Sequence, residues 1–181
     1  MRPYQQLPFQ ASIHILERKG GPLRHVEYLG DGRSDPRPGL AECLAKNIGA
    51  KGTVIAYNAG FEGQCLEGLA KAFPKYAKSL LSAKQRLWDL GAPFRSSMYV
   101  HPDFRGSWSI KVVLPTLVPD MSYENLAIGD GGEAQLAYLS LMIGPASADQ
   151  RIQIMKNLRE YCGQDTLAMV KLLERLSRSG S

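Results

Sequence analysis

An alternation of apolar and polar positions near the start of the chain predicts an antiparallel pair of strands. Apolar residues occupy every second position from 9 to 16, which is the period of a strand with one buried face. A turn through Gly20 and Gly21 follows, and the apolar segment 25–29 is predicted to pair back as the second strand.

A short buried strand that leads directly into a helix is predicted in the middle of the chain. Residues 53–57, Thr-Val-Ile-Ala-Tyr, form an apolar run rich in β-branched side chains, and Asn-Ala-Gly at 58–60 ends it. Strand ends of this kind are the usual location of ligand sites in α/β folds, which places Asn58 and Glu62 at such an edge. A carboxylate in a first helical turn is also favoured by the helix dipole, so its position alone does not assign a function to Glu62.

Helical periodicity accounts for most of the remaining chain. Helices are predicted at residues 40–48, 61–73, 76–87, 109–117, 133–143 and 148–176, with a short strand at 88–90, a long loop at 91–107 and a helical turn at 122–126. This order of strands and helices predicts one α/β or α+β domain with a mixed sheet over residues 1–181.

The formal net charge of +5 is concentrated in one third of the chain. Between residues 63 and 119, eight Lys or Arg residues are opposed by three acidic residues. Such an asymmetry favours a polyanionic partner, and nucleic acid is the first candidate. A solvated helix face would produce the same pattern over residues 71–86.

The predicted loop at 91–107 interleaves aromatic and basic side chains, which suit the bases and phosphates of single-stranded nucleic acid. The predicted nucleic-acid-binding residues are Arg95, Tyr99, His101, Arg105, Lys111 just beyond the loop, and the strand-end Asn58. A loop folded over a small core by its own aromatic side chains is the alternative interpretation.

Several functional classes are disfavoured by composition. No apolar run approaches the roughly 18 residues of a membrane span, and the polar amino end does not resemble a signal peptide. The odd number of widely spaced cysteines, three, predicts reduced thiols in a cytoplasmic protein. The histidines show no ligand spacing, so a zinc site is not expected.

Within the last predicted helix, Tyr161 and Asp165 are four residues apart and therefore share one helix face. Such a pair is common by itself. Together with the strand-end sequence Asn-Ala-Gly-Phe-Glu at 58–62, it resembles the DEDD superfamily of 3′–5′ exonucleases, in the subgroup that has Tyr-x-x-x-Asp as its third motif.

Longer phrases resemble an uncharacterised bacterial domain family that is itself similar to these exonucleases. They are Pro-Tyr-Gln-Gln-Leu-Pro-Phe-Gln at 3–10, Tyr-Asn-Ala-Gly-Phe-Glu at 57–62, Gly-Ser-Trp-Ser-Ile-Lys-Val-Val-Leu-Pro at 106–115 and Tyr-Cys-Gly-Gln-Asp-Thr-Leu-Ala-Met-Val at 161–170. The resemblance covers nearly the whole chain. It implies a ribonuclease H-like fold, in which helices flank both faces of a five-stranded mixed sheet.

The chemistry that this resemblance implies is two-metal hydrolysis of phosphodiesters, with Mg²⁺ or Mn²⁺ ions about 4 Å apart and bound by carboxylates. Glu62 matches the acid of the second motif, and Asp165 matches that of the third. Tyr161 matches the tyrosine that positions or helps to deprotonate the attacking water, and Asn58 matches the strand-end asparagine.

Two departures predict an incomplete site. The second acid is usually Asp, and Glu62 is one methylene longer. The first motif, Asp-x-Glu on the first strand, is not found, because residues 9–16 contain no carboxylate and match the second strand of the family. We therefore expect the first strand to lie upstream of Met1 in a longer protein, or to have been lost. Metal binding is expected to be poor or absent, with little or no hydrolysis.

Without its usual first strand, the sheet would have a gap between the strands at 9–16 and 53–57. Residues before Phe9 could fold in, the two strands could pair directly, or a second copy or an upstream domain could lend a strand. Pro3 and Pro8 disfavour the first arrangement, so direct pairing or a dimer contact is predicted. Glu62 and Asp165 are expected to approach each other at one end of this sheet. A non-catalytic nucleic-acid-binding module and a partner-docking domain remain alternative functions.

Overall fold

The computed structural model describes residues 7–18 and 20–179. Its strands are β1 (Gln10–Leu16), β2 (Leu23–Leu29), β3 (Val54–Ala56) and β4 (Leu87–Asp89). Its α-helices are α1 (Arg37–Asn47), α2 (Ala59–Ala72), α3 (Ala77–Gln85), α4 (Ala92–Arg95), α5 (Ile110–Leu117), α6 (Gly131–Ile143) and α7 (Ala148–Ser179), and short 3-10 helices span Pro74–Tyr76 and Pro102–Phe104.

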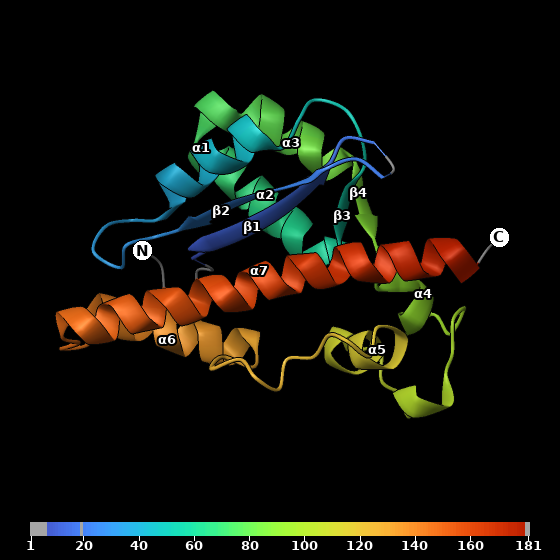
Figure 1. The fold of residues 1–181 in the computed structure, drawn as a ribbon. Coiled ribbons are helices and arrows are strands. Elements are labelled where there is room, and N and C mark those ends of the chain that lie inside the picture. The colour runs from blue at the N-terminus through green and yellow to red at the C-terminus, as the bar shows by residue number, and fades with distance from the viewer. Residues whose placement is uncertain (1–6, 19, 180–181) are drawn as a thin grey trace.

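The strands form two small sheets between layers of helices. β1 pairs antiparallel with β2, and β3 pairs parallel with β4. Helices α1, α2 and α3 lie on one side of the strands, whereas α7 crosses the other side with α5 and α6 beyond it (Figure 1). The protein therefore has a mixed α/β fold, as the order of elements predicted.

The expected single five-stranded sheet is not formed by the described residues. β1 and β3 belong to different sheets and do not pair with each other, so the prediction of direct pairing was wrong. The physical reason is that α2 and α7 both pack between the two strand pairs, which holds the pairs apart. Residues 1–6, which could also have contributed a strand, lie outside the described residues.

The start of α2 is set by local sequence. Asn58 is its N-cap, and the Asn58 side chain accepts a hydrogen bond from the Phe61 N–H. The helix ends at Ala72, and Pro74 begins the short 3-10 helix that separates α2 from α3. Glu62 is thereby placed in the first turn of α2, directly beyond the carboxyl end of β3.

The segment at 91–107 is more structured than expected. It contains α4 and a 3-10 helix, and the Phe94 and Phe104 side chains are buried in the core cluster that α5 and α7 complete. Prolines in the first turns start both short helices without requiring backbone N–H partners. The helical turn predicted at 122–126 is a non-helical turn instead.

Helix α7 is the longest element, and it joins the sheet layer to the rest of the domain. Leu158, Ala168 and Leu172 are fully buried along its length. None of the helices in the described part of the chain is long and apolar enough to cross a membrane.

One turn requires glycine for two separate reasons. Gly32 has a φ of +71°, and a Cβ atom at this position would lie 2.7 Å from the Leu141 Cβ atom. Gly20 has nearly the same φ, +72°, but a Cβ atom there would meet nothing within 4 Å. We expect Gly20→Ala to cost about 1 kcal/mol of unfolding free energy from backbone strain, and Gly32→Ala to cost about 1–3 kcal/mol more from the steric overlap. Urea denaturation of both variants measures the difference, and equal losses would contradict the packing argument.

Candidate functional site

A large cleft of about 1810 Å³ lies between the two sheets. Both β1 and β3 line it, together with one face of α2 and one face of α7. Its volume exceeds the roughly 300–1,000 Å³ of most small-molecule sites. Glu62 and Asp165, the two acidic residues that the sequence singled out, both line this cleft.

Hydrogen bonds between β1 and α7 position the helix that carries Asp165. The Gln10 Nε2 donates to the Leu158 carbonyl at 2.7 Å. Further along both elements, the Thr166 hydroxyl lies 2.6 Å from the Ser12 hydroxyl and 2.8 Å from His14 Nδ1. These contacts set the rotation of α7 about its axis and so direct the next side chain, that of Asp165, to one wall of the cleft.

Glu62 is held in an unusual environment for a carboxylate. Its Oε2 atom is buried and has no hydrogen-bond partner among the described residues. Burial raises the pKa of Glu62 to about 7, and the negative charges of Asp89 and Asp165 raise it further. This side chain is therefore about half protonated near neutral pH, and its charge responds to any cation that enters the cleft.

Asp165 has better hydrogen-bonding partners. The Tyr123 hydroxyl donates to Asp165 Oδ1 at 2.6 Å. Burial raises the pKa of Asp165, although hydrogen bonds from Tyr123 and Tyr161 and the charge of Lys111 act in the opposite direction. Burial and the Asp165 charge also raise the pKa of both phenols, so each stays protonated at neutral pH and acts as a hydrogen-bond donor.

The structure brings together three of the predicted site residues: Glu62, Asp165 and Tyr161. Asp165 acts on the pKa of Glu62, and Tyr161 hydrogen-bonds Asp165. Within residues 7–18 and 20–179, no group of three or more His, Cys, Asp or Glu side chains is arranged to hold a metal ion. The described residues therefore contribute a pair of carboxylates to this cleft and no larger cluster.

Two thiols also line the cleft, and neither is suited to nucleophilic attack. Burial raises the pKa of Cys162 to about 12, and it raises that of Cys65 as well. Because the thiolate is the reactive form, both side chains are inert at neutral pH.

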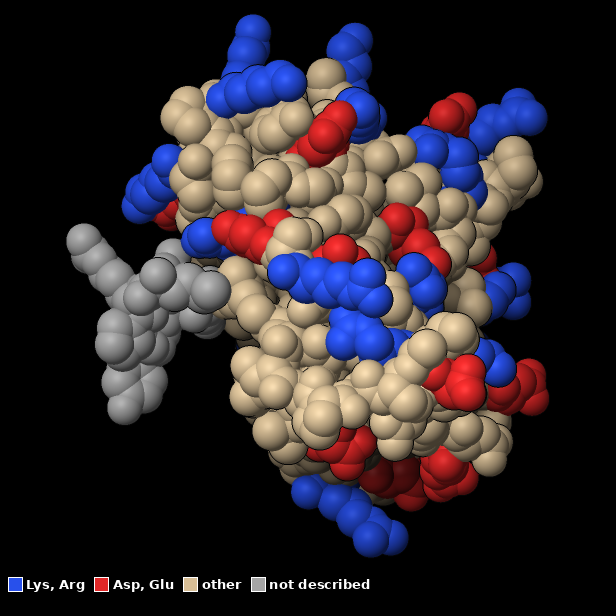
Figure 2. All heavy atoms as spheres, turned by 90° about the vertical axis from the view of Figure 1, so that its left-hand side faces the viewer, with Lys and Arg blue, Asp and Glu red and all other residues tan. Residues whose placement is uncertain are grey.

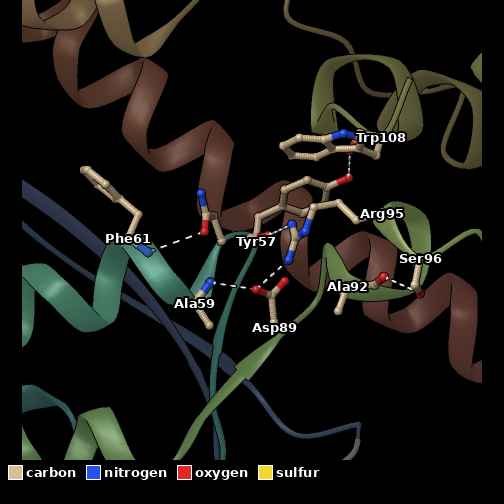
Figure 3. Close-up of polar contacts among 9 residues, drawn as sticks. Tyr57, Ala59, Phe61, Asp89, Ala92, Arg95, Ser96 and Trp108 are labelled. Atoms are coloured by element: carbon tan, nitrogen blue, oxygen red, sulfur yellow. Dashed lines mark hydrogen bonds and ion pairs between the residues drawn. The ribbon is translucent and has the colours of Figure 1, made fainter. Parts of the chain in front are cut away.

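Next to the cleft, Asp89 forms a polar anchor that the sequence did not mark as part of a site. Its Oδ2 atom accepts a hydrogen bond from the Ala59 N–H at 3.0 Å and lies 2.7 Å from the Arg95 guanidinium (Figure 3). Asp89 thus connects the end of β4 with the first turn of α2. A carboxylate at the carboxyl end of a short predicted strand was the only local signal for this role.

Arg95 is used inside the domain. Besides its ion pair with Asp89, its guanidinium carbon lies 5.2 Å from the centre of the Trp108 ring, and the Tyr57 hydroxyl donates to the Trp108 carbonyl at 2.7 Å (Figure 3). The exposed fraction of the Arg95 side chain is 30%. This residue therefore stabilises the loop that follows α4, a role that leaves little of its charge for a ligand.

The other predicted nucleic-acid-binding residues lie away from the cleft, since none of them lines it. Asn58 caps α2, Tyr99 packs against Phe94 and Phe104, and the His101 ring accepts the Asp103 N–H at 3.2 Å. Arg105 is exposed in a left-handed conformation, and Lys111 Nζ lies 3.8 Å from the Asp130 carboxylate. Aromatic packing thus follows the alternative interpretation of this loop, and only Arg105 is both basic and freely presented.

Surface charges are mixed. On the face shown in Figure 2, Lys and Arg alternate with Asp and Glu. Within the basic third of the chain, Lys71 and Lys84 both form ion pairs with Glu67 at 2.6 Å. Part of the basic excess is therefore neutralised within the domain, as expected for a solvated helix face.

Comparisons with known proteins identify a family and nothing more specific. Searches of curated proteins and of solved structures found no match. A family model described as a domain of unknown function, DUF2779, matches residues 1–109, which is more than half of the chain. The matched segment includes Glu62 and Asp89 and ends before Tyr161 and Asp165. The chain therefore belongs to the DUF2779 family.

Proposed function

We propose that this chain is a nuclease-like domain related to the metal-dependent 3′–5′ exonucleases, with a ribonuclease H-like arrangement of its sheets. Glu62 and Asp165 are proposed to serve as two of the metal ligands. In this proposal the domain binds single-stranded nucleic acid at the cleft and is catalytically incomplete with the described residues alone. The observation that carries it is the pair of carboxylates, from distant parts of the sequence, that share one buried cleft.

The state of these carboxylates supports a cation as their missing partner. A buried carboxylate oxygen without a hydrogen bond, such as Glu62 Oε2, is costly unless a donor or a cation compensates it. Mg²⁺ and Mn²⁺ prefer carboxylate oxygens, and their charge would lower the raised pKa values of both side chains. In sites of this class a divalent ion supplies polarisation of the phosphoryl group and a water of lowered pKa.

Tyr161 and Tyr123 have a positioning role in this proposal. Both are protonated donors that hold Asp165 from two sides, because burial raises the pKa of each phenol. Tyr161 is therefore better suited to orienting Asp165 or a water molecule than to removing a proton. The expectation that it helps to deprotonate water is not favoured by this environment.

A non-catalytic binding module is a second candidate, and the exposed loop surface favours it. Met98, Val100 and Trp108 are exposed by 81%, 72% and 46%, and Arg105 lies beside them in the sequence. Exposed aromatic and basic side chains are typical of single-strand binding. The free thiols of the described cysteines fit a reducing compartment, and we propose the cytoplasm as the location.

A metal-dependent binding experiment tests the main proposal. We expect Mn²⁺ to raise the affinity for a fluorescein-labelled single-stranded oligonucleotide by about tenfold over EDTA, since one added charge-assisted contact contributes about 1.5 kcal/mol. Asp165→Asn and Glu62→Gln should each abolish this gain. Glu160→Gln on α7 and Glu67→Gln on α2 are the matched controls, because both carboxylates are in ion pairs and neither lines the cleft.

Fluorescence anisotropy measures the affinity, and a denaturing gel measures hydrolysis of the same oligonucleotide. Binding that is unaffected by Mn²⁺ and by both cleft variants would assign the nucleic-acid surface elsewhere, in favour of the loop around Arg105. Metal-dependent cleavage by the unmodified chain that Asp165→Asn removes would contradict the view that the site is incomplete.

A further inference from the structure

Two strands present unpaired edges to the same cleft. Among the described strands, β1 pairs with β2 alone and β3 with β4 alone, and both β1 and β3 line the cleft. A sheet of two strands is marginally stable by itself and usually gains further strands or a covering layer. The position between β1 and β3 is therefore where an additional strand would pair on both sides.

The hydrogen-bonding pattern of β1 shows which backbone groups are available. The Gly30 N–H donates to the Phe9 carbonyl at 2.9 Å, and the register places these two residues opposite each other. Because residues of an antiparallel strand alternate in direction, odd-numbered residues of β1 direct their N–H and C=O groups to β2. The even-numbered residues direct theirs to the cleft; they are Gln10, Ser12, His14 and Leu16. On this edge, the Ser12 N–H already hydrogen-bonds the Cys162 thiol, which is a weak acceptor.

The same argument applies to β3. The Val54 N–H donates to the Arg86 carbonyl at 3.0 Å, and the Leu90 N–H donates to the Ala56 carbonyl at 2.8 Å. Alternate residues of β3 are thus committed to β4, and the backbone of Ile55, which lies between them, is directed to the cleft.

The other two walls of the cleft are helix faces. Cys65, Leu66 and Leu69 line it from α2, and Met169, Val170 and Leu173 line it from α7, in each case at helical spacing. The space is therefore bounded by two backbone edges and two mostly apolar side-chain layers. A strand that is buried on both faces is rich in Val and Ile and contains no proline.

We propose that the cleft is an acceptor site for one β-strand of a partner polypeptide. This strand is an extended, proline-free segment of about five to seven residues, rich in β-branched side chains, which pairs with β1 on one side and β3 on the other. Facing rows of backbone donors and acceptors select a polypeptide over a lipid or a small apolar ligand, neither of which can pair with both. The inference goes beyond the proposed nuclease-like function and does not depend on it.

Hydrogen exchange of the ¹⁵N-labelled full chain tests the proposal. The probe is a synthetic peptide of seven alternating Val and Thr residues with two C-terminal lysines for solubility. At a peptide concentration about ten times its Kd, exchange of the His14 and Ile55 amides should slow by about tenfold, because only the free protein exchanges. The Ile13 amide, which already faces β2, should change far less. Failure of the peptide to bind, or binding that leaves the His14 and Ile55 amides unchanged, overturns the proposal.

Two controls separate strand pairing from apolar contact. A peptide with the same side chains but alternate backbone nitrogens methylated should lose at least about tenfold in affinity, since each lost bond contributes roughly 1 kcal/mol. Val170→Arg places a charge in the cleft and should abolish binding, whereas Ile152→Arg makes the same change on α7 at a residue that is 68% exposed and outside the cleft.

Equal binding of the methylated peptide to the unmodified protein would contradict pairing without requiring any variant to fold. Slow exchange at His14 and Ile55 that depends on protein concentration alone would assign the cleft to a second copy of this chain, which also overturns the proposal. Loss of nucleic-acid binding in Glu62→Gln or Asp165→Asn bears only on the nuclease-like function.

Discussion

Replacing Glu62 by Gln is expected to raise the free energy of unfolding by about 2–3 kcal/mol at about pH 8, and to change it little at about pH 4. The native pKa of this side chain is about 7, compared with an ordinary value of 4.5, because the carboxylate is buried. Gln has the shape of the protonated acid and carries no charge, so the variant avoids the cost of an ionised group in the cleft.

The direction of the pH dependence follows from proton binding. Below about pH 4.5 the side chain is protonated in both the folded and the unfolded chain, and it makes no difference. Between about pH 4.5 and pH 7 the unfolded chain loses this proton and the native chain keeps it, so the contribution of Glu62 to stability falls as pH rises. Above about pH 7 both states are ionised, and the loss is complete.

Urea denaturation at several pH values between about 4 and 8 measures this effect as the difference between wild type and Glu62→Gln. Glu67→Gln is the matched control on the same helix. Lys71 and Lys84 lower the pKa of Glu67 to about 2, so this variant should gain no stability at high pH. A Glu62→Gln difference that is independent of pH would show that the Glu62 carboxylate is not shifted. Addition of Mn²⁺ at about pH 8 should reduce the gain if the cation binds the ionised side chain.

The Asp89→Ala variant is expected to lose about 3 kcal/mol of unfolding free energy. Asp89 accepts a hydrogen bond from the Ala59 N–H and forms an ion pair with Arg95, both through Oδ2. Hydrogen bonds to charged groups contribute about 1.5–3 kcal/mol each, and truncation leaves a helix N-terminal N–H and a partly buried guanidinium without this acceptor. The first turn of α2, which carries Glu62, would then lose its connection to β4.

Asp89→Asn should lose about half as much, because a neutral amide oxygen still accepts from the Ala59 N–H but no longer pairs with a charge. The control is Asp35→Ala. Asp35 pairs with Arg37 at 2.6 Å, but its side chain is 39% exposed, and pairs of this kind contribute about 0–1 kcal/mol. Thermal or urea denaturation of the three variants gives the comparison. Similar losses in Asp89→Ala and Asp35→Ala would mean that Asp89 is an ordinary surface acid.

Elements with a strong local signal were predictable from the sequence. The alternation at 9–16 is the strand β1, the β-branched run at 53–57 contains β3, and the helical periodicity after residue 148 is α7. In each case neighbouring residues carry the information, because backbone geometry brings every second or every third to fourth side chain to one face. The Asn58 cap of α2 is local for the same reason, since its partner is only three residues away.

Other features depend on contacts that sequence spacing does not encode. The gap between β1 and β3 exists because α2 and α7 separate two strand pairs, and an estimate of strand propensity contains no information about that spacing. Direct pairing of these strands was accordingly a wrong prediction.

The state of the acidic residues is also a tertiary property. From the sequence, Glu62 and Asp165 are two carboxylates 103 positions apart; burial on opposite walls of one cleft is what raises the pKa of both. Asp89 and Arg95 form an anchor only because β4 ends beside the first turn of α2. By itself, the sequence determined which segments are strands and helices and which acids stand at their ends. The tertiary structure alone decided which of these acids share a cleft, because burial and electrostatic interaction act between side chains that only folding brings together.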